Sequence, residues 1–306
     1  MDYVSNTLIN TRKLFPNVKY KPDEPMSSHT SFKIGGPVRA MFIPGSADEL
    51  TRLYETLADG GINPFIMGNG TNLLVDDAPL DMVVIKTTEL CAIEQTGETE
   101  ITAESGISLA KLALFASERS LSGLEFAHGI PGTLGGAISM NAGAYGSEMK
   151  DIVHSTKAFD PKSGIYAATG AEHGFSYRRS RFSDTSAAVL SSTIHLQKGD
   201  PNNIAALMRD LSARRHDSQP LAVPSAGSTF KRPKEGYAAK LIEEAGLKGY
   251  TIGGAQVSAK HAGFIINTGA ATFNDVMSLI AHVQEAVHKQ YDINLEPEVK
   301  IITRHP

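Results

Sequence analysis

The stretch GIPGTLGGAISMNAGAYG, residues 129–146, decides how the middle of this chain folds. It holds six glycines among eighteen residues, no charged residue, and mostly small or apolar residues between the glycines. So little side-chain bulk lets a planar ring or a pyrophosphate approach the main chain closely. The stretch fits neither G-x-G-x-x-G after a strand nor the Walker pattern, which disfavours a Rossmann site and a P-loop. Its apolar residues favour a packed segment over a flexible loop.

A second glycine turn lies upstream, at Gly68-Asn69-Gly70-Thr71-Asn72-Leu73. It follows Phe65-Ile66-Met67, which reads as a short buried strand. Glycines allow successive N–H groups to line an anion-binding concavity, and the Thr71 and Asn72 side chains add donors. A lone G-N-G turn is far more often a plain hairpin or loop, so both interpretations stay open for this turn taken alone.

The elements around these two segments indicate an α+β fold rather than strict βαβ alternation. Residues 46–60 form a helix, with Ser46 and Glu49 at capping-box spacing and Gly60-Gly61 as its end. The last long helix is expected over 274–291, and Thr272 and Asp275 have the same capping-box spacing at its start. Further helices are expected within 1–25 and over 109–120, 203–216 and 237–245, and strands over 38–43, 82–86, 91–103, 152–196, 252–257, 263–267 and 299–302.

The character of the chain changes near Pro201, which predicts two domains. The first spans residues 1–200, with its core at about 30–197, and the second spans residues 201–306. The second domain ends in a strand at 298–303 that is expected to return toward the first domain. The sequence shows no internal repeat.

Composition excludes several classes of protein. The net charge is −4 and no basic tract is visible, so nothing favours nucleic acid. Cys91 is the only cysteine, which rules out a disulfide framework or a cysteine metal cluster, and the ten histidines show no metal-ligand spacing. The first residues lack the features of a signal peptide, and no apolar run suits a membrane span. We therefore expect a cytoplasmic protein without a membrane or nucleic-acid partner, with monomer as the default.

Polar motifs downstream of the glycine-rich segment carry the candidate chemistry. They are Tyr177-Arg178-Arg179-Ser180-Arg181-Phe182, Gly227-Ser228-Thr229-Phe230-Lys231-Arg232-Pro233 and Leu295-Glu296-Pro297-Glu298-Val299, with Gln256 and His261 between the last two. Each motif taken alone has a plain structural interpretation: a solvated basic turn, a capping serine and two exposed carboxylates. No G-x-S-x-G elbow surrounds Ser228, so a hydrolase nucleophile is disfavoured.

The order of all these motifs resembles the UDP-N-acetylenolpyruvoylglucosamine reductase family. The matching runs are 68–73, 123–132, 135–146, 177–178, 227–231 and 295–299, and the likeness extends from about Thr30 to Ile302. Members of this family are flavoenzymes of peptidoglycan precursor synthesis. The resemblance implies an FAD-binding region of the vanillyl-alcohol-oxidase type, made of two α+β subdomains, and a smaller α/β substrate domain.

The resemblance also implies which residues hold non-covalent FAD and which hold the UDP-sugar. The expected flavin contacts are Gly68, Asn69, Gly70, Thr71, Asn72, Leu73, Gly129, Pro131, Gly132, Gly135, Gly136, Ala142, Gly143, Ala144 and Tyr145. The expected substrate contacts are Lys231, Arg232, Gln256 and His261.

The chemistry implied by the family has two halves. NADPH reduces FAD, and hydride then passes from flavin N5 to the vinyl carbon of UDP-N-acetylglucosamine enolpyruvate, giving UDP-N-acetylmuramate. Arg178 matches the arginine that faces the developing negative charge, Ser228 the proton donor, and Glu298 a glutamate beside the enolate. A carboxylate would repel an enolate, so we expect Glu298 to be protonated or paired during turnover.

Two features depart from the best-known bacterial form. Only fifty positions separate Arg178 from Ser228, too few for the extra tyrosine-bearing loop that covers substrate there, so the chain resembles the shorter class. Arg232 stands where that form has asparagine, and a second cation near the diphosphate suits phosphate geometry. Two alternatives stay open: an oxidase of the same superfamily with FAD tethered at His128, and a UDP-sugar binder without activity. Cys91 lies outside the glycine motifs.

Overall fold

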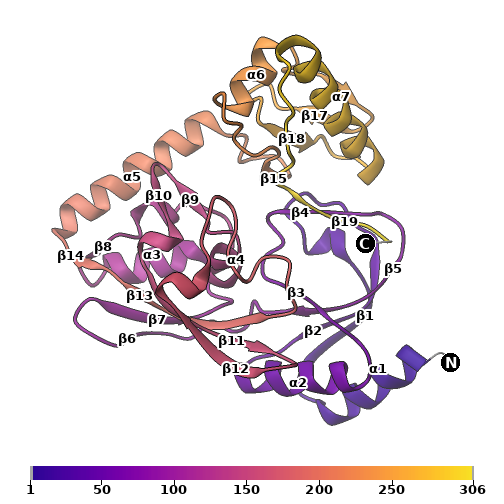
Figure 1. The fold of residues 1–306 in the computed structure, drawn as a ribbon, viewed down its shortest axis with the longest axis vertical. Coiled ribbons are helices and arrows are strands. Elements are labelled where there is room, and N and C mark those ends of the chain that lie inside the picture. The colour runs from indigo at the N-terminus through magenta and orange to yellow at the C-terminus, as the bar shows by residue number, and fades with distance from the viewer. Residues whose placement is uncertain (1–2, 305–306) are drawn as a thin grey trace. The chain divides into compact units, whose positions relative to one another are not determined.

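The protein is described by a computed structural model over residues 3–304. Its contacts divide the chain into two compact units (Figure 1). The first unit holds the chain up to Pro22, Ala40–Asn69 and Met82–Ala213. The second holds Asp23–Arg39, Gly70–Asp81 and the chain from Arg214 onward. Each unit has its own apolar core, described in turn below.

The helices form where the sequence predicts them, except over residues 134–139 in the glycine-rich segment, where no helix is expected. They are α1 (Tyr3–Leu14), α2 (Ala47–Asp59), α3 (Leu109–Ser117), α4 (Leu134–Ser139), α5 (Pro201–Ser218), α6 (Ala238–Glu244) and α7 (Phe273–Tyr291). Thr272 and Asp275 form the predicted capping box of α7. At α2 the box is incomplete: Ser46 Oγ accepts from Glu49 N, but the Glu49 carboxylate accepts from Gly45 N instead of Ser46 N. Helix α3 ends three residues before the predicted Ser120, which has a left-handed φ of 56°.

A five-stranded antiparallel sheet, β12-β11-β13-β7-β6, is the centre of the first unit (Figure 1). Its strands are β6 (Ile93–Gln95), β7 (Glu100–Glu104), β11 (Val153–Asp160), β12 (Gly164–Thr169) and β13 (Ala188–His195). Helices α3 and α4 share an apolar core with it. Two short pairs accompany this sheet: β9 (Gly143–Ala144) with β10 (Ser147–Glu148), and β8 (Leu121–Ser122) with β14 (Gln197–Lys198).

A second sheet has the order β1-β2-β5-β3. Its strands are β1 (Lys19–Pro25), β2 (Pro37–Ile43), β3 (Phe65–Met67) and β5 (Leu80–Lys86). Strands β1, β2 and β5 each begin in one unit and end in the other, so the chain passes between the units three times here. Apolar residues of α1 and α2 form one buried cluster with Ala40 and Phe42 of β2.

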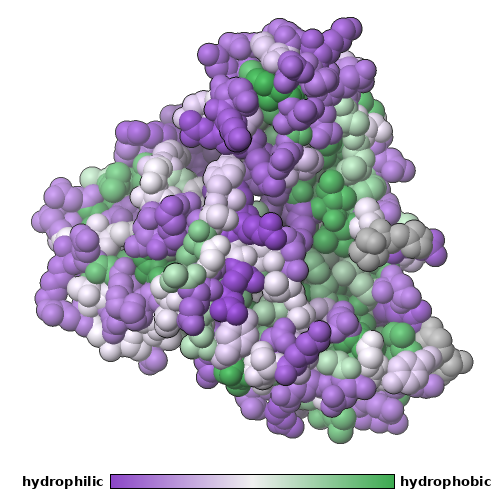
Figure 2. All heavy atoms as spheres, viewed as in Figure 1, coloured by the Kyte–Doolittle hydropathy of each residue, from purple (hydrophilic) through white to green (hydrophobic). Residues whose placement is uncertain are grey.

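The second unit is built on the antiparallel sheet β15-β18-β17-β16 and helices α6 and α7. Its strands are β15 (Ser225–Ser228), β16 (Thr251–Ile252), β17 (Ala255–Val257) and β18 (Phe264–Asn267). A parallel pair, β4 (Leu73–Val75) with β19 (Lys300–Ile302), also belongs to this unit. In Figure 2, hydrophilic residues cover most of the visible surface of α6 and α7, as expected for helices that bury one apolar face.

One expectation needs adjustment, and the contacts add a division of the chain that the sequence does not reveal. The strand expected over 252–257 is a hairpin, because Gly253 has a φ of 53° and turns the chain between β16 and β17. The contacts divide the chain inside α5, between 213 and 214, and place residues 23–39 and 70–81 with the C-terminal segment. This division depends on long-range pairs such as β4 with β19, which no local pattern reveals. The functional domain boundary at 200 and 201 stays a prediction.

Candidate active site

The glycine-rich segment is packed rather than loose. Residues 134–139 form α4, with Thr133 as its N-cap, and the segment then turns through the β9–β10 hairpin. Tyr145 and Gly146 form the two-residue turn of that hairpin, with φ values of 57° and 90°. Positive φ at both positions is the type I′ pattern, which is costly for a residue such as tyrosine. The Tyr145 hydroxyl donates to Leu211 O of α5 at 3.1 Å.

The segment contacts the upstream glycine turn at Gly68. A Cβ added to Gly68 would lie 2.2 Å from Thr133 Oγ1, so only glycine allows this approach. Thr133 is buried and its Oγ1 accepts from Gly136 N at 3.4 Å. Gly135 is equally constrained, because its Cβ would lie 2.9 Å from Cβ of the buried Ser105. The structure therefore brings the two predicted glycine motifs into contact within the first unit.

The later half of the upstream turn belongs to the second unit, and Gly70 there has a φ of 63°. Ser31 N donates to Gly70 O at 3.2 Å. Asn72 Nδ2 donates to Glu298 O at 3.1 Å, and Asn72 O accepts from Lys300 N. The sequence predicts Asn72 only as a flavin contact. Its hydrogen bonds to the segment that carries Glu298 are found only in the structure.

Arg178 lies on a tight turn of the first unit. Ser176 and Arg179 exchange two backbone hydrogen bonds, of 2.9 and 3.2 Å, and Arg178 between them has a φ of 55°. Its Nη2 lies 3.5 Å from Gly143 O, and its guanidinium carbon lies 5.1 Å from the ring centroid of Tyr177. Arginine in a left-handed conformation is rare, and such strain persists where surrounding structure imposes it.

Ser228 and Glu298 come together in the second unit although 70 positions separate them. Thr229, next to Ser228, accepts a 2.8 Å hydrogen bond from Glu298 N at its carbonyl oxygen. Ser228 is the exposed last residue of β15 and pairs with Phe264 of β18. Between these pairs two residues of β15, Ala226 and Gly227, oppose the single residue Ile265 of β18, so a β-bulge forms with Gly227 at a φ of 80°. Bulges of this kind re-aim a neighbouring side chain.

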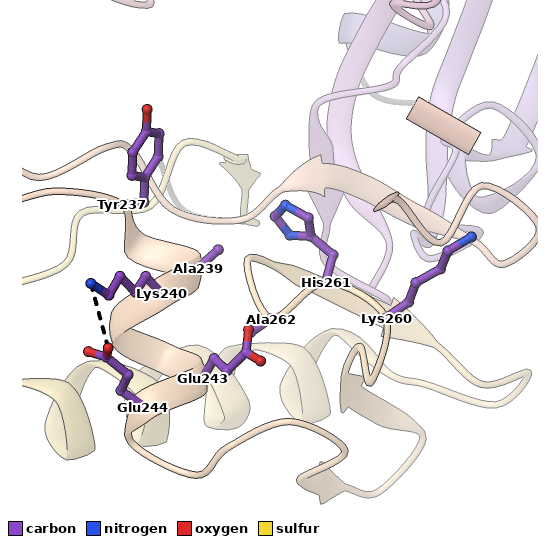
Figure 3. A pocket seen from close by; sticks show the side chains of 8 residues that line it. All are labelled: Tyr237, Ala239, Lys240, Glu243, Glu244, Lys260, His261 and Ala262. Carbon is purple, nitrogen blue, oxygen red and sulfur yellow. Dashed lines mark ion pairs between the residues drawn. The ribbon is translucent and has the colours of Figure 1, made fainter. Parts of the chain in front are cut away.

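A cavity of about 520 Å³ opens in the second unit. Its lining residues are Tyr237, Ala239, Lys240, Glu243, Glu244, Lys260, His261 and Ala262 (Figure 3). Lys240 and Glu244 form an ion pair along α6 at 3.7 Å, drawn as a dashed line. The cavity thus combines cationic, anionic and aromatic groups.

His261 is held by its own loop. Its Nδ1 accepts from Gly263 N at 3.2 Å, and the buried Ser258 Oγ accepts from His261 N at 3.3 Å. Burial is the main cause that lowers the pKa of His261 below the ordinary histidine value. Because Nδ1 accepts a hydrogen bond, the neutral ring carries its proton on Nε2 and presents a donor there.

The other predicted substrate contacts already have partners. Lys231 Nζ pairs with Glu296 at 3.0 Å, and Gln256 Nε2 donates to Thr251 at 3.0 Å. The Arg232 guanidinium carbon lies 4.0 Å from the ring centroid of Tyr237, which lines the cavity. Of the four, His261 lines the cavity and Arg232 reaches it through Tyr237, whereas Lys231 and Gln256 are not among its lining residues.

The structure also describes the surroundings of the single cysteine and tests for metal and membrane sites. Cys91 Sγ donates to Thr88 O at 3.0 Å, and burial raises the pKa of its thiol. Among residues 3–304, no group of three His, Cys, Asp or Glu residues could hold a metal ion. None of the helices in the described chain is long and apolar enough to cross a membrane.

Comparison with known proteins decides the family. A family model for the UDP-N-acetylenolpyruvoylglucosamine reductase C-terminal domain matches residues 219–302, and one for the FAD binding domain matches residues 38–169. The chain is 52% identical over 280 residues to UDP-N-acetylenolpyruvoylglucosamine reductase of Caldanaerobacter subterraneus subsp. tengcongensis, covering 92% of each chain. The chain belongs to the UDP-N-acetylenolpyruvoylglucosamine reductase family. It is therefore a member of a family of FAD-dependent oxidoreductases, as its motifs predict.

Solved structures agree with this family and with the predicted fold class. The crystal structure of UDP-N-acetylenolpyruvylglucosamine reductase from Thermus caldophilus has a TM-score of 0.79 and 30% identity. It covers 94% of this chain and 99% of that chain. Alkyldihydroxyacetonephosphate synthase, at 17% identity and a TM-score of 0.50, covers 63% of this chain and 40% of its own and shows the fold alone. The α+β class with a vanillyl-alcohol-oxidase-type flavin-binding region is confirmed.

The residues of the first unit fit the flavin that this family carries. Ser105 Oγ, Glu125 Oε1 and His128 Nδ1 are buried without a hydrogen-bond partner in the described chain. Glu125 and His128 come just before the glycine-rich segment in the sequence, and Ser105 packs against Gly135. Buried polar groups are normally satisfied, so these three atoms without partners suit a polar cofactor. The sequence suggests His128 only as a tether for the flavin, and no motif points to Ser105 or Glu125.

Proposed function

We propose that this chain reduces UDP-N-acetylglucosamine enolpyruvate to UDP-N-acetylmuramate with NADPH as the electron source and non-covalent FAD as the carrier. FAD held by the glycine motifs of the first unit would supply the hydride-transfer chemistry, with NADPH as the source of the hydride and the vinyl carbon of the substrate as its acceptor. The observation that carries the proposal is the pairing of the Ser228 and Glu298 segments in a chain that is 52% identical to a named reductase of this family.

Ser228 is proposed to protonate the second carbon. A serine hydroxyl is a weak acid, but an enolate carbon is basic enough to take its proton when the hydroxyl is held against it. The bulge at Gly227 and the pairing of Ser228 with Phe264 fix the direction of this side chain on a strand rather than on a free loop. Thr229 anchors the same strand end, because Thr229 N donates to Gly263 O at 2.8 Å.

Arg178 and Glu298 are proposed to manage the negative charge that develops beside the substrate carboxylate. A fixed guanidinium stabilises such charge, and losing one such contact costs on the order of 10²–10³ in rate. Glu298 would repel an enolate if it were ionised and unpaired, so we propose that it is protonated or paired during turnover. Its backbone is held on both sides, by Thr229 O and by Asn72 Nδ2, which limits its movement.

The UDP part of the substrate is proposed to use the second unit. His261 presents a neutral Nε2–H donor at the cavity, and Arg232 and Lys231 supply positive charge on the segment that follows Ser228. Arginine suits the bidentate geometry of a phosphate better than lysine does. Gln256 adds an amide on strand β17 of the same sheet.

The Ser228→Ala variant tests the assignment of roles. We expect NADPH to reduce its flavin at the wild-type rate, because Ser228 has no part in that half. We expect the substrate to reoxidise the flavin on the order of 10²-fold more slowly, the lower end of the range for losing one catalytic proton donor. Anaerobic stopped-flow absorbance of the flavin measures both rates. Ser225→Ala, on the same strand, is the control, and an equal loss in both half-reactions of Ser228→Ala would remove Ser228 from this role.

The oxidase alternative is tested by the attachment of the flavin. A tether at His128 would keep the yellow colour in acid-precipitated protein, whereas non-covalent FAD leaves with the supernatant. Full release of the colour is expected.

A further inference from the structure

The side chain of Asn141 joins the glycine-rich segment to the turn that carries Arg178. Asn141 is fully buried, at 0% exposure, and has a left-handed φ of 42°. Its Nδ2 donates to Ser176 O at 3.0 Å and to Glu148 Oε2 at 3.0 Å. Its Oδ1 accepts from Lys150 N at 2.9 Å. One amide therefore uses both of its ends to connect three segments of the first unit.

The Arg178 turn has further ties to the glycine-rich segment, because Arg178 Nη2 donates to Gly143 O at 3.5 Å. Ser176 O, which accepts from Asn141, is also the acceptor that closes the turn from Arg179 N. Beyond the turn, the hydroxyls of Ser180 and Ser183 both donate to Ser139 O, at 3.0 and 2.5 Å. These two bonds hold the residues that follow the turn, whereas Asn141 binds Ser176, the first residue of the turn.

We infer that Asn141 is a positioning residue that fixes the Arg178 turn against the glycine-rich segment and so sets the place of the guanidinium. The inference rests on the proposed function for the part that Arg178 plays in it. The position of that cation matters because a misplacement of about 1 Å can cost on the order of 10² in rate.

Asparagine suits this position for two separate reasons. It adopts left-handed backbone conformations more readily than other residues with a side chain apart from aspartate and histidine. It also offers a donor and an acceptor on one planar group, which both Ser176 O and Lys150 N require. Aspartate would keep the backbone conformation and the acceptor but would lose the donor, and this makes Asn141→Asp the sharpest variant.

Two further variants separate the possible causes of any defect. Asn141→Asp also places a carboxylate beside Glu148, so Asn141→Asp/Glu148→Gln removes that repulsion while the bond to Ser176 stays lost. Asn141→Gly tolerates the backbone angle and removes the side chain without adding charge, so it serves if Asn141→Asp fails to fold. Asn267→Asp is the matched control, because Asn267 is a buried asparagine in the second unit that donates to Phe32 O at 3.1 Å.

The first readout is cleavage by trypsin, which needs no substrate or flavin activity. Arg178, Arg179 and Arg181 are potential cleavage sites on or next to the turn. Native cleavage there requires local opening. We expect Asn141→Asp and the double variant to be cut in this turn about tenfold faster, the factor for about 1.4 kcal/mol of lost hydrogen bonding. Asn267→Asp should leave cleavage at this turn unchanged, with fragments identified by mass spectrometry.

The second readout separates the two half-reactions of the flavin-bound protein. We expect NADPH to reduce the flavin of Asn141→Asp within about twofold of wild type, while reoxidation by UDP-N-acetylglucosamine enolpyruvate slows roughly 10- to 100-fold. The double variant should remain slow. Unchanged cleavage at the turn overturns the inference, and so does faster cleavage with normal reoxidation or with an equal fall in both half-reactions. If the wild-type flavin is not reoxidised by this substrate, the proposed function fails, while the trypsin result still decides whether Asn141 holds the turn.

Discussion

Gly68→Ala puts the contact between the two glycine motifs to a direct test. The added Cβ would lie 2.2 Å from Thr133 Oγ1 and 3.0 Å from Thr133 Cγ2. Thr133 has little freedom to rotate away, because it is 2% exposed and its hydroxyl caps α4. Overpacking of this kind costs about 1–3 kcal/mol, and losing the cap costs about 0.5–2 kcal/mol. One of the two costs must appear in the variant.

The expected result is a lower melting temperature and weaker flavin binding. Each kcal/mol lowers Tm by about 2–4 °C in a domain of this size. We also expect the Kd for FAD to rise at least about tenfold, because the turn and α4 can no longer approach each other. Differential scanning fluorimetry gives Tm, and titration of the stripped protein with FAD gives Kd.

Gly60→Ala is the matched control for this experiment. Its Cβ would lie 2.4 Å from Thr7 Cγ2, so it has a similar collision with a threonine but lies outside both glycine motifs. It should lower Tm while FAD binds as in wild type. Thr133→Ala combined with Gly68→Ala should recover part of the loss, since the two Thr133 atoms nearest to the new methyl group, Oγ1 and Cγ2, are then absent. Wild-type FAD affinity in Gly68→Ala, or strict additivity in the double variant, would mean that the contact between Gly68 and Thr133 does not set the affinity for FAD.

Three further outcomes are expected. In stopped-flow, Gly227→Ala should keep the wild-type rate of flavin reduction but slow reoxidation of the flavin by the substrate. Alanine at a φ of 80° strains the bulge by about 1–2 kcal/mol and changes the direction of the Ser228 side chain. A normal rate of reoxidation would mean that the bulge does not orient Ser228. Thr272→Ala should lower the stability of the second unit by about 0.5–2 kcal/mol in urea unfolding, through loss of the α7 capping box, and an unchanged midpoint would contradict this. Burial lowers the pKa of His173 in the native state. The imidazole is therefore protonated near pH 6.5 in the unfolded protein but stays neutral at that pH in the native protein. Stability should therefore be greatest above pH 6.5 and fall by up to about 1.4 kcal/mol per pH unit below it, with a shallower fall in His173→Gln measured by urea unfolding across pH 5–8.

Local patterns explain why much of the fold is predictable. Helix α7 begins at the predicted Thr272 because its cap, its acidic third residue and its apolar spacing lie within one stretch of chain. The β6–β7 hairpin likewise needs only alternation and a turn at Gly97. In contrast, β4 pairs with β19 across more than 200 positions, and no spacing within either strand reveals its partner. Long-range pairing of this kind places residues 70–81 with the C-terminal segment.

The candidate site divides in the same way. Ser228 and Glu298 are identified by motif, but their shared attachment to Thr229 depends on tertiary contacts. Asn141 lies within residues 129–146, but the sequence does not predict its hydrogen bond to Ser176 O, because this bond depends on the tertiary fold. The cavity-lining Lys240 and Lys260 sit in stretches without any distinctive pattern, because an exposed lysine on a helix or loop is common.

The most direct test of the account is whether the proposed substrate takes the electrons. The wild-type protein is loaded with FAD, reduced by one equivalent of NADPH without oxygen, and mixed with UDP-N-acetylglucosamine enolpyruvate. If the proposed function is correct, the oxidised flavin spectrum returns rapidly and mass spectrometry finds a product heavier than the substrate by two hydrogens. A flavin that stays reduced, with the substrate recovered unchanged, would contradict it.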